Sequence, residues 1–464
     1  MPYSAAALLP SAQQRIVALL DDNTFRSYPQ QQHGAAAGQS LVTGTGTIDG
    51  VPVCVFAQDT TYFGGSVGVS DGKQIAELQQ HALNLKRPII GIWDGGGARI
   101  QDGVGALAAF GNIFRANVKS TGHIAQVSVV VGACAGGACY SPALTDFIIM
   151  IKDKSRMFLT GPEVTRQLTG DNVTAEQLGG CQLHTTNSGV AHYGADNEQA
   201  AFAYARNLLS YVTCPTRPQY VEPNSNVAIP LSAAQPYDMR TVLRTVFDQG
   251  SFLEVQPDYA ANLITGYARI AGKSVAIVAS QPMQLAGVLD AKAAHKGARF
   301  VATSSRLGLP IITFVDVPGF LPGVEQEEAG IIQAGADLVQ AYVSAKTNDI
   351  VPLVTVIIRK AFGGAYIALG SKSLGADWVA AWPTAQIGIM DAASAVGVVH
   401  RRELAELAAA DGQAAAAAAH TAYVTAYQNT QTAQQALLAG QLDAVIAPDG
   451  TRRFVLDALD ALDA

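Results

Sequence analysis

The chain has 464 residues, of which 49% are hydrophobic and only 14% are charged. This composition excludes a disordered or polyelectrolyte chain, and the length favours two or three domains, of which we expect two. A net charge of -7 without a basic cluster argues against nucleic acid as a partner. No uncharged apolar run approaches the ~18 residues of a membrane span, and the first ten residues lack the features of a signal peptide, so we expect a cytoplasmic protein.

An internal repeat divides the chain. The segment GTIDGVPVCVFA at residues 46–57 matches ARIAGKSVAIVA at residues 268–279, which pairs Gly50 with Gly272 at an offset of 222. RPIIGIWD at residues 87–94 matches LPIITFVD at residues 309–316 with the same offset. SVVVGACAGGACY at residues 128–140 matches TVIIRKAFGGAYI at residues 355–367 with an offset of 227. Because the three blocks keep their order, the sequence predicts two tandem copies of one fold.

The same elements are predicted in the same order in both copies. An alternating apolar pair of strands is followed by an amphipathic helix, with Asp71 as the expected N-cap in the first copy and Asp290 in the second. Continuously apolar segments at residues 89–93 and 311–315 predict strands that are covered on both faces. A second helix and a second buried strand follow, at residues 127–131 and 353–358. The pattern is typical of an α/β fold wound from β-β-α units.

A proline-rich segment separates the copies. Residues 214–237 combine polar residues without helical period and five prolines, namely Pro215, Pro218, Pro223, Pro230 and Pro236. We therefore place the domain boundary near residue 230, between domains 1–230 and 231–464. From Arg401 onward, strong helix formers predict helices whose role is packing.

Each copy has a Gly-Gly-Ala sequence where its second buried strand meets a helix. These are Gly136, Gly137 and Ala138 in the first copy, and Gly363, Gly364 and Ala365 in the second. Glycines leave successive backbone N–H groups bare, so that a carbonyl or oxyanion can approach. Tight packing is the alternative explanation. Two such turns predict two oxyanion holes that act on two carbonyl oxygens.

A further glycine-rich turn follows the strand at residues 89–93 and offers backbone to a ligand; it contains Gly95, Gly96, Gly97, Ala98 and Arg99. A plain strand-to-helix turn is an equally good interpretation. Side chains suited to general base catalysis are scarce near the glycine turns, and we interpret Asp94 and Asp316 as turn caps.

Residues that commonly bind metals are not arranged for it. The five cysteines form no CxxC pair, which indicates reduced thiols; they are Cys54, Cys134, Cys139, Cys181 and Cys214. His184 and His192 lie eight residues apart, and hydrogen-bonded histidines explain them better than a metal pair. No metal site is predicted.

Several blocks of the sequence resemble the biotin-dependent acyl-CoA carboxyltransferases, in particular the propionyl-CoA carboxylase β subunit and the transcarboxylase 12S subunit. The blocks are FGGS (63–66), GGARIQ (96–101), CAGGACYSPALTD (134–146), GGCQLHTTNSGVAH (179–192), FVDVPGFLPG (314–323), RKAFGGAY (359–366) and AWPTAQI (381–387). The likeness extends from about residue 11 to residue 448.

The resemblance implies two tandem crotonase-like (ClpP/crotonase) domains. It implies that the N-terminal domain binds an acyl-CoA, and that the C-terminal domain binds carboxybiotin on a separate carrier protein. By the family's motif, Gly136 and Gly137 hold the enolate oxygen of the thioester, whereas Gly364 and Ala365 hold the ureido oxygen, with Gly363 and Tyr366 beside them. Carboxybiotin then supplies both CO2 and the base that removes the α-proton, which accounts for the missing catalytic side chain.

The resemblance also implies a homo-hexamer, built as a dimer of trimers, with sites between chains. No biotin-attachment Met-Lys-Met sequence and no ATP-binding loop is present, so the biotin carboxyl carrier and biotin carboxylase would be other chains. Ile367 resembles an acyl-pocket position and suits a short acyl chain. The sequence departs from the family's pattern at Gly95, where Ser is usual, at Gln333 and Asp337, where basic residues are usual, and in its shortened termini.

Four other functions stay open. The chain could act in the reverse direction, as the α subunit of a methylmalonyl-CoA decarboxylase with membrane subunits as partners, or as a transcarboxylase. A crotonase-type hydratase would need a carboxylate facing the first hole, and no Glu lies near Gly136 in the sequence. A scaffold without activity would not need intact Gly-Gly pairs.

Overall fold

The computed structural model describes residues 11–28, 40–214, 216–223, 235–347 and 351–463. The chain forms two compact units, Met1–Cys214 and Pro215–Ala464. The boundary predicted near residue 230 lies outside the described residues. None of the helices in the described ranges combines the length and apolarity needed to cross a bilayer.

Unit 1 is built on a mixed sheet with the strand order β1-β2-β3-β4-β5-β6-β8, and β7 adds to β5. The β2–β3 hairpin is antiparallel, and the pairs from β3 to β8 are parallel. The strands are β1 Arg26–Ser27, β2 Leu41–Ile48, β3 Val51–Gln58, β4 Ile89–Gly95, β5 Gln126–Ala135, β6 Phe147–Ile151, β7 Arg156–Phe158 and β8 Tyr193–Ala195.

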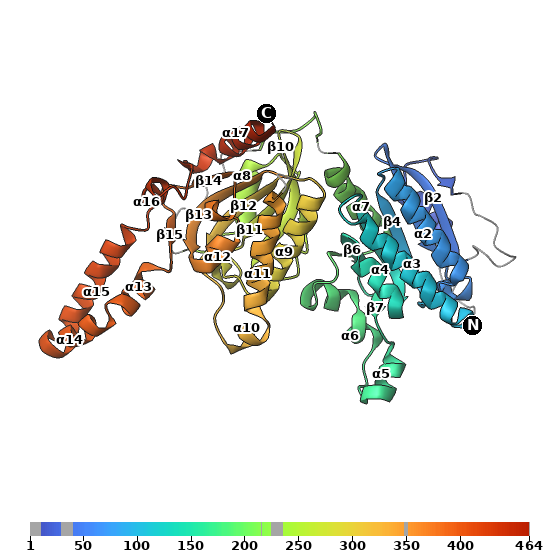
Figure 1. The fold of residues 1–464 in the computed structure, drawn as a ribbon, viewed down its shortest axis with the longest axis horizontal. Helices are drawn as coiled ribbons and strands as arrows, with labels where there is room; N and C mark the ends of the chain where they lie inside the picture. Colours follow the sequence, from blue (N-terminus) through green and yellow to red (C-terminus); the bar gives the residue numbers. More distant parts are fainter. Residues whose placement is uncertain (1–10, 29–39, 215, 224–234, 348–350, 464) are drawn as a thin grey trace, which may run out of the picture. The chain divides into compact units, whose positions relative to one another are not determined.

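Helices α2 and α3 of unit 1 pack side by side (Figure 1). Helix α1 contacts α7 and β3. The helices are α1 Ala12–Leu19, α2 Val69–Asn84, α3 Val104–Ser120, α4 Tyr140–Ala143, α5 Pro162–Thr169, α6 Ala175–Gly179 and α7 Glu198–Thr213. Single turns of 3-10 helix are η1 Phe63–Gly65, η2 Ile100–Asp102 and η3 Gly136–Cys139, and η4 Leu183–Asn187 is a π-helix.

Unit 2 repeats the arrangement, with the strand order β16-β14-β13-β12-β11-β10-β9 and β15 on β13. Helices α9 and α11 lie side by side, as α2 and α3 do in unit 1 (Figure 1). The strands are β9 Leu253–Val255, β10 Leu263–Ile270, β11 Lys273–Ser280, β12 Ile311–Val317, β13 Leu353–Phe362, β14 Trp378–Ala381, β15 Gln386–Gly388 and β16 Ala444–Val445.

The helices of unit 2 are α8 Met239–Val246, α9 Ala291–Arg306, α10 Val324–Glu328, α11 Ile331–Lys346, α12 Gly363–Ala368, α13 Ala392–Val399, α14 Arg401–Asp411, α15 Gln413–Gln428, α16 Ala433–Leu438 and α17 Thr451–Asp463. Its 3-10 turns are η5 Leu285–Gly287, η6 Lys372–Leu374 and η7 Pro448–Gly450. In Figure 1, α13, α14 and α15 extend away from the sheet of this unit as an arm.

The predicted repeat is confirmed by an equivalent pair of isolated β-bridges, which lie outside the matched sequence blocks. The isolated bridge between Val67 and Ala98 recurs between Leu289 and Phe320, again at an offset of 222. The predicted double-covered strands are also confirmed, because every residue of β4 and of β12 is buried. Each unit therefore closes a hydrophobic core of its own around these central strands.

One of the two predicted helix caps is confirmed. Asp290 caps α9 by accepting a hydrogen bond from the Ala293 N–H. Asp71 is not an N-cap, because α2 begins one turn earlier, with Gly68 as its N-cap. The Asp71 carboxylate instead reaches back to the Gly68 N–H, as in a capping box.

Two further predictions concern the proline-rich segment and the C-terminal tail. Part of the proline-rich segment pairs with unit 2, since the Arg217 N–H donates to the Gly272 carbonyl oxygen over 2.9 Å. The tail is helical as predicted, and α17 buries Val455 and Leu459 in the core. Helices α14 and α15 pack against each other, and α13 packs against α15, although α14 has no buried residue and α15 buries only Ala416.

Lys296 on α9 is buried, and its ammonium group donates to the carbonyl oxygens of Gln256, Tyr259 and Leu263 over 2.8, 2.8 and 2.6 Å. We expect Lys296→Met to lower the free energy of unfolding by about 3 kcal/mol or more, since each orphaned buried carbonyl costs ~1–3 kcal/mol. Urea denaturation measures the loss. Lys292→Met, on the exposed face of the same helix, is the control, and an equal loss in both variants would contradict the expectation.

Candidate functional site

Both Gly-Gly turns have the predicted local structure. Gly136 follows β5 with φ +65°, and Gly363 follows β13 with φ +62°. That left-handed conformation favours glycine and explains the first glycine of each pair. The helical turn that begins at each pair receives no hydrogen bond from a capping side chain.

The second glycine of each pair has no such explanation. Gly137 and Gly364 are exposed, and neither has a positive φ. A Cβ atom at Gly137 would meet no atom within 4 Å, and one at Gly364 would meet only the Phe320 ring, at 3.9 Å. Tight packing within this chain, the alternative explanation, therefore does not account for these two glycines. Bare backbone at both positions is available to a ligand.

Three glycine segments meet at the first turn. A Cβ atom at Gly97 would lie 2.6 Å from the carbonyl oxygen of Ala135, the residue before the Gly-Gly pair. On its other side the 95–97 segment touches the turn of η1, where the Gly96 N–H donates to the Gly64 carbonyl oxygen over 3.2 Å. A Cβ atom at Gly65 would lie 2.1 Å from the Asp94 carbonyl oxygen. The predicted wall at residues 95–99 is thus packed, backbone to backbone, between η1 and the Gly136 turn.

Arg99, predicted to line the substrate site, has its guanidinium turned into unit 1. Its Nη2 donates to Ser40 Oγ over 2.7 Å, to the Ser66 carbonyl oxygen over 2.9 Å and to Asp71 Oδ2 over 2.5 Å. The group also lies over the Phe63 ring, 4.6 Å from its centroid. Arg99 therefore ties η1 to the start of α2, and it is the backbone of this segment that borders the first turn.

Each strand that ends in a Gly-Gly pair contains the same bulge. The β4–β5 register shifts between Trp93 and Gly95, and the β12–β13 register shifts between Val315 and Val317. Asp94 and Asp316 occupy these shifts. Their interpretation as turn caps was wrong, because both lie inside strands, are buried and form ion pairs with arginines.

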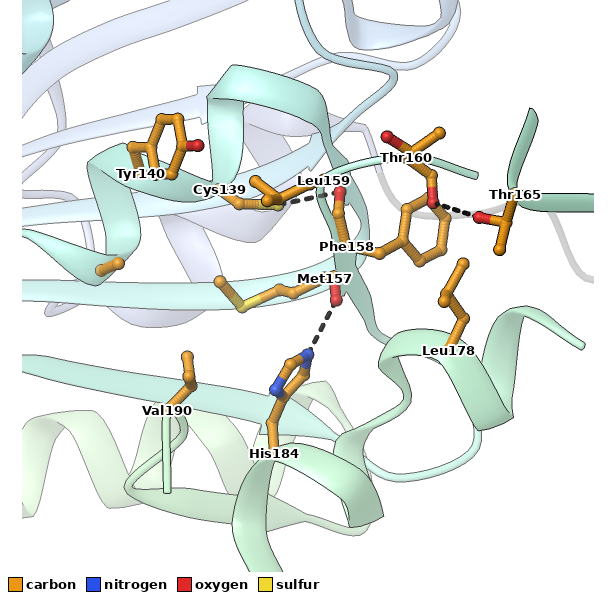
Figure 2. A pocket seen from close by; sticks show the side chains of 11 residues that line it. Cys139, Tyr140, Met157, Phe158, Leu159, Thr160, Thr165, Leu178, His184 and Val190 are labelled. Atoms are coloured by element: carbon orange, nitrogen blue, oxygen red, sulfur yellow. Dashed lines mark hydrogen bonds between the residues drawn. The ribbon is translucent and has the colours of Figure 1, made fainter. Parts of the chain in front are cut away.

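Unit 1 has an apolar cavity of about 520 Å³ beside its glycine turn (Figure 2). Cys139 and Tyr140, directly after the turn, form one wall, and Met157, Leu159 and Val190 are among the other lining residues. No carboxylate lines this cavity among the described residues.

Unit 2 has a cavity of about 650 Å³ at the equivalent place, and its lining contains more hydroxyl and amide groups. Gly363, Gly364 and Ile367 line it, together with Tyr366 and Ser371. The hydroxyl groups of Tyr366 and Ser371 are buried and have no hydrogen-bond partner. Burial raises the pKa of Tyr366 to about 12, so its hydroxyl stays protonated at neutral pH and can donate.

His184 and His192 both form hydrogen bonds, as predicted. His184 Nε2 bonds to the Met157 carbonyl oxygen over 2.7 Å (Figure 2), and His192 Nδ1 accepts from the Ile148 N–H over 2.9 Å. None of the five cysteines forms a disulfide bond with another described residue. No group of three or more His, Cys, Asp or Glu side chains in the described ranges could hold a metal ion.

Two parts of the site were missing from the sequence-based prediction. One is the pair Gly64 and Gly65 of η1, which contact the 95–97 segment; the signal in the sequence is the Gly-Gly pair after β3. The other is the pair of bulges in β5 and β13. No local sequence pattern predicts a bulge, because it depends on how two strands pair.

The chain is similar to known proteins over nearly its whole length. The carboxyl transferase domain family matches residues 11–464. The biotin-dependent acetyl-/propionyl-coenzyme A carboxylase beta5 subunit of Mycobacterium leprae is 45% identical, with 98% of this chain and 87% of that protein covered. The methylmalonyl-CoA decarboxylase subunit alpha of Veillonella parvula is 43% identical, with 97% and 90% covered.

Among solved structures, the transcarboxylase 12S hexamer with methylmalonyl-coenzyme A and methylmalonic acid bound has a TM-score of 0.90 and 40% sequence identity, and the match covers 98% of this chain and 89% of that chain. The fold and these similarities thus define a carboxyl transferase. More particularly, the chain belongs to the biotin-dependent acyl-CoA carboxyltransferases. The predicted α/β fold of two tandem crotonase-like domains is confirmed by the same match.

Proposed function

We propose that this chain is the carboxyltransferase subunit that moves a carboxyl group between carboxybiotin and the α-carbon of a short-chain acyl-CoA, either propionyl-CoA or acetyl-CoA. The observation that carries the proposal is the pair of exposed glycines, Gly137 and Gly364, which neither φ nor packing explains. They stand at equivalent places in two units, which suits a reaction with two oxygens that gain negative charge.

We assign the acyl-CoA to unit 1. Gly136 and Gly137 would hold the thioester oxygen as it becomes an enolate, with Ala138 and the backbone of residues 95–99 beside it. The apolar cavity lined by Tyr140 and Leu159 supports this assignment, because a short acyl chain offers no hydrogen bonds. Losing one donor of such a hole costs on the order of 10² to 10³ in rate.

We assign biotin to unit 2, where Gly364 and Ala365 would hold the ureido oxygen. The unpartnered hydroxyl groups of Tyr366 and Ser371 fit a ring that both donates and accepts hydrogen bonds. When bound, carboxybiotin supplies the CO2 and the base for the α-proton. The protein's own part is to align the two ligands and stabilise charge, which agrees with the absence of a carboxylate among the described lining residues of either cavity.

Because this chain would bind biotin without carrying or carboxylating it, the reaction requires partner proteins. Biotin would arrive on a carrier protein and be carboxylated by a biotin carboxylase, both on other chains, and a homo-hexamer would complete the sites. The relative from Veillonella parvula and the 12S subunit support decarboxylation or transcarboxylation as alternatives for the physiological direction. We propose a cytoplasmic location.

The purified chain is expected to decarboxylate methylmalonyl-CoA or malonyl-CoA only when biotin or a biotinyl carrier is added. The reason is that no side chain of the described cavities replaces the base that biotin provides. Release of propionyl-CoA or acetyl-CoA, followed by chromatography, measures the reaction. Hydration of crotonyl-CoA without biotin would overturn the proposed function in favour of a hydratase, and the subunits that co-purify from the native source would decide the direction.

A further inference from the structure

The two bulges are built around buried carboxylates that pair with arginines from different elements. In unit 1, Asp94 Oδ2 accepts from Arg15 Nη1 of α1 over 2.9 Å. In unit 2, Asp316 Oδ2 lies 3.0 Å from Arg359 Nε, and Arg359 belongs to β13 itself. The side chains of Asp94 and Asp316 keep 10% and 1% of their exposure. Both units thus have an aspartate at the bulge, but the arginine that pairs with it comes from α1 in unit 1 and from β13 in unit 2.

Asp316 holds the backbone just before the second glycine turn. Its Oδ1 accepts from the Lys360 N–H over 3.1 Å, three residues ahead of Gly363. Its own N–H donates to Ser280 Oγ over 3.2 Å, so β11, β12 and β13 are joined at this point. The carboxylate occupies the place where the regular β12–β13 ladder is interrupted.

Arg359 is fixed on its other sides. Its Nη1 donates to the Gln235 carbonyl oxygen over 2.8 Å, and its guanidinium lies 5.0 Å from the centroid of the Tyr237 ring. Burial and the Asp316 carboxylate raise the pKa of Tyr237, which therefore remains neutral beside the pair. Burial raises the pKa of Asp316, although the Arg359 guanidinium acts in the opposite direction.

In unit 1 the Asp94 carboxylate lies at the corresponding interruption of the β4–β5 ladder. A Cβ atom at Gly132, four residues before Gly136, would lie 2.0 Å from Asp94 Oδ1. Arg15 is held in turn by Glu198, through Nε and Nη2 at 3.0 Å each. A buried ion pair rarely adds stability over apolar side chains of the same size, because both charges lose their hydration. Two such pairs beside two functional turns therefore point to a role in geometry.

We propose that Asp316 is a positioning residue for the Gly363–Gly364 turn, with Arg359 as its neutralising partner, and that Asp94 with Arg15 does the same for the Gly136–Gly137 turn. This inference rests on the proposed function, in which the turns serve biotin and the thioester respectively. Each carboxylate sets the path of the strand that delivers its amides, and it touches neither ligand.

The test compares Asp316→Ala, Asp316→Asn and Asp94→Ala in the full chain. One measurement is calorimetric binding of methylmalonyl-CoA without biotin, which gives affinity and stoichiometry. The other is biotin-dependent decarboxylation of methylmalonyl-CoA, which gives kcat/KM for free biotin. Stoichiometry equal to wild type excludes an inactive fraction as the cause of a lower rate.

We expect Asp316→Ala to lower kcat/KM for biotin ~100-fold, the size of effect that a misplaced catalytic group produces, with methylmalonyl-CoA affinity within about twofold of wild type. Asp316→Asn keeps an acceptor for the Lys360 N–H, so its loss should be smaller, ~10-fold. Asp94→Ala should instead weaken methylmalonyl-CoA binding and leave the KM for biotin near wild type. If Asp316→Ala does not fold, the kcat/KM of Asp316→Asn for biotin tests the proposed role of Asp316.

Two results would overturn the inference while leaving the proposed function intact. One is an active wild type whose Asp316 variants keep full kcat/KM for biotin. The other is a loss of methylmalonyl-CoA affinity in the Asp316 variants equal to their loss of turnover, which would show that Asp316 does not act specifically on the Gly363–Gly364 turn. A wild type without any biotin-dependent turnover would instead contradict the proposed function itself.

Discussion

Replacing Ala365 with proline is expected to abolish carboxyl transfer, with a loss of at least ~10²-fold in biotin-dependent turnover. Proline has no N–H, so the variant deletes one donor of the second hole. Ala365 lies in the first turn of α12, where backbone N–H groups have no acceptor within the helix, so the helix itself loses no hydrogen bond. The affinity for methylmalonyl-CoA should stay near wild type, because that ligand is assigned to unit 1.

Ala365→Val is the matched control, since Ala365 is buried and valine adds comparable bulk while keeping the N–H. Equal turnover in the valine and proline variants would count against the second hole. Ala138→Pro is the counterpart in unit 1, and we expect it to impair use of methylmalonyl-CoA while the KM for biotin changes little.

A second large effect is expected for Gly97→Ala, which places a methyl group 2.6 Å from the Ala135 carbonyl oxygen at a φ of +95°. Because the overlapping atom is a backbone oxygen, relief of the overlap moves either the 95–97 segment or the backbone that leads into Gly136, and both border the first turn. We expect kcat/KM for methylmalonyl-CoA to fall ~100-fold. Steady-state kinetics with saturating biotin measures the change.

Gly170→Ala separates the overlap from the cost of a left-handed conformation. Gly170 has φ +81°, and a Cβ atom there would meet nothing within 4 Å. The Gly170→Ala variant should therefore lose about 1 kcal/mol of unfolding free energy, and its turnover should equal that of the wild type. If both glycine variants lose activity to the same degree, backbone strain in unit 1 is the cause, and the assigned contact with Ala135 is not.

The sequence was sufficient for the parts of the molecule that depend on local patterns. Continuous apolar runs predicted β4 and β12, and the offsets of 222 and 227 predicted the second unit from the first. The Gly-Gly pairs were located correctly because a strand that ends in glycines is visible in the sequence. The family was identified for the same reason, since its motifs are short and contiguous.

Other features were decided only by tertiary structure. Asp94 pairs with Arg15, 79 residues away, and Arg99 with Asp71, 28 residues away. The sequence alone favours turn caps for Asp94 and Asp316, since nothing local distinguishes a cap from a buried ion pair.

The alternating and continuous apolar patterns, the repeat and the positions of the glycines were determined by the sequence itself, because they follow from the hydrophobic effect and from backbone sterics within a few residues. Which glycines are free to face a ligand, and which charges meet inside a bulge, was decided when distant strands came together. A buried charge takes whichever partner the packing brings within reach, and that choice has no signature along the chain.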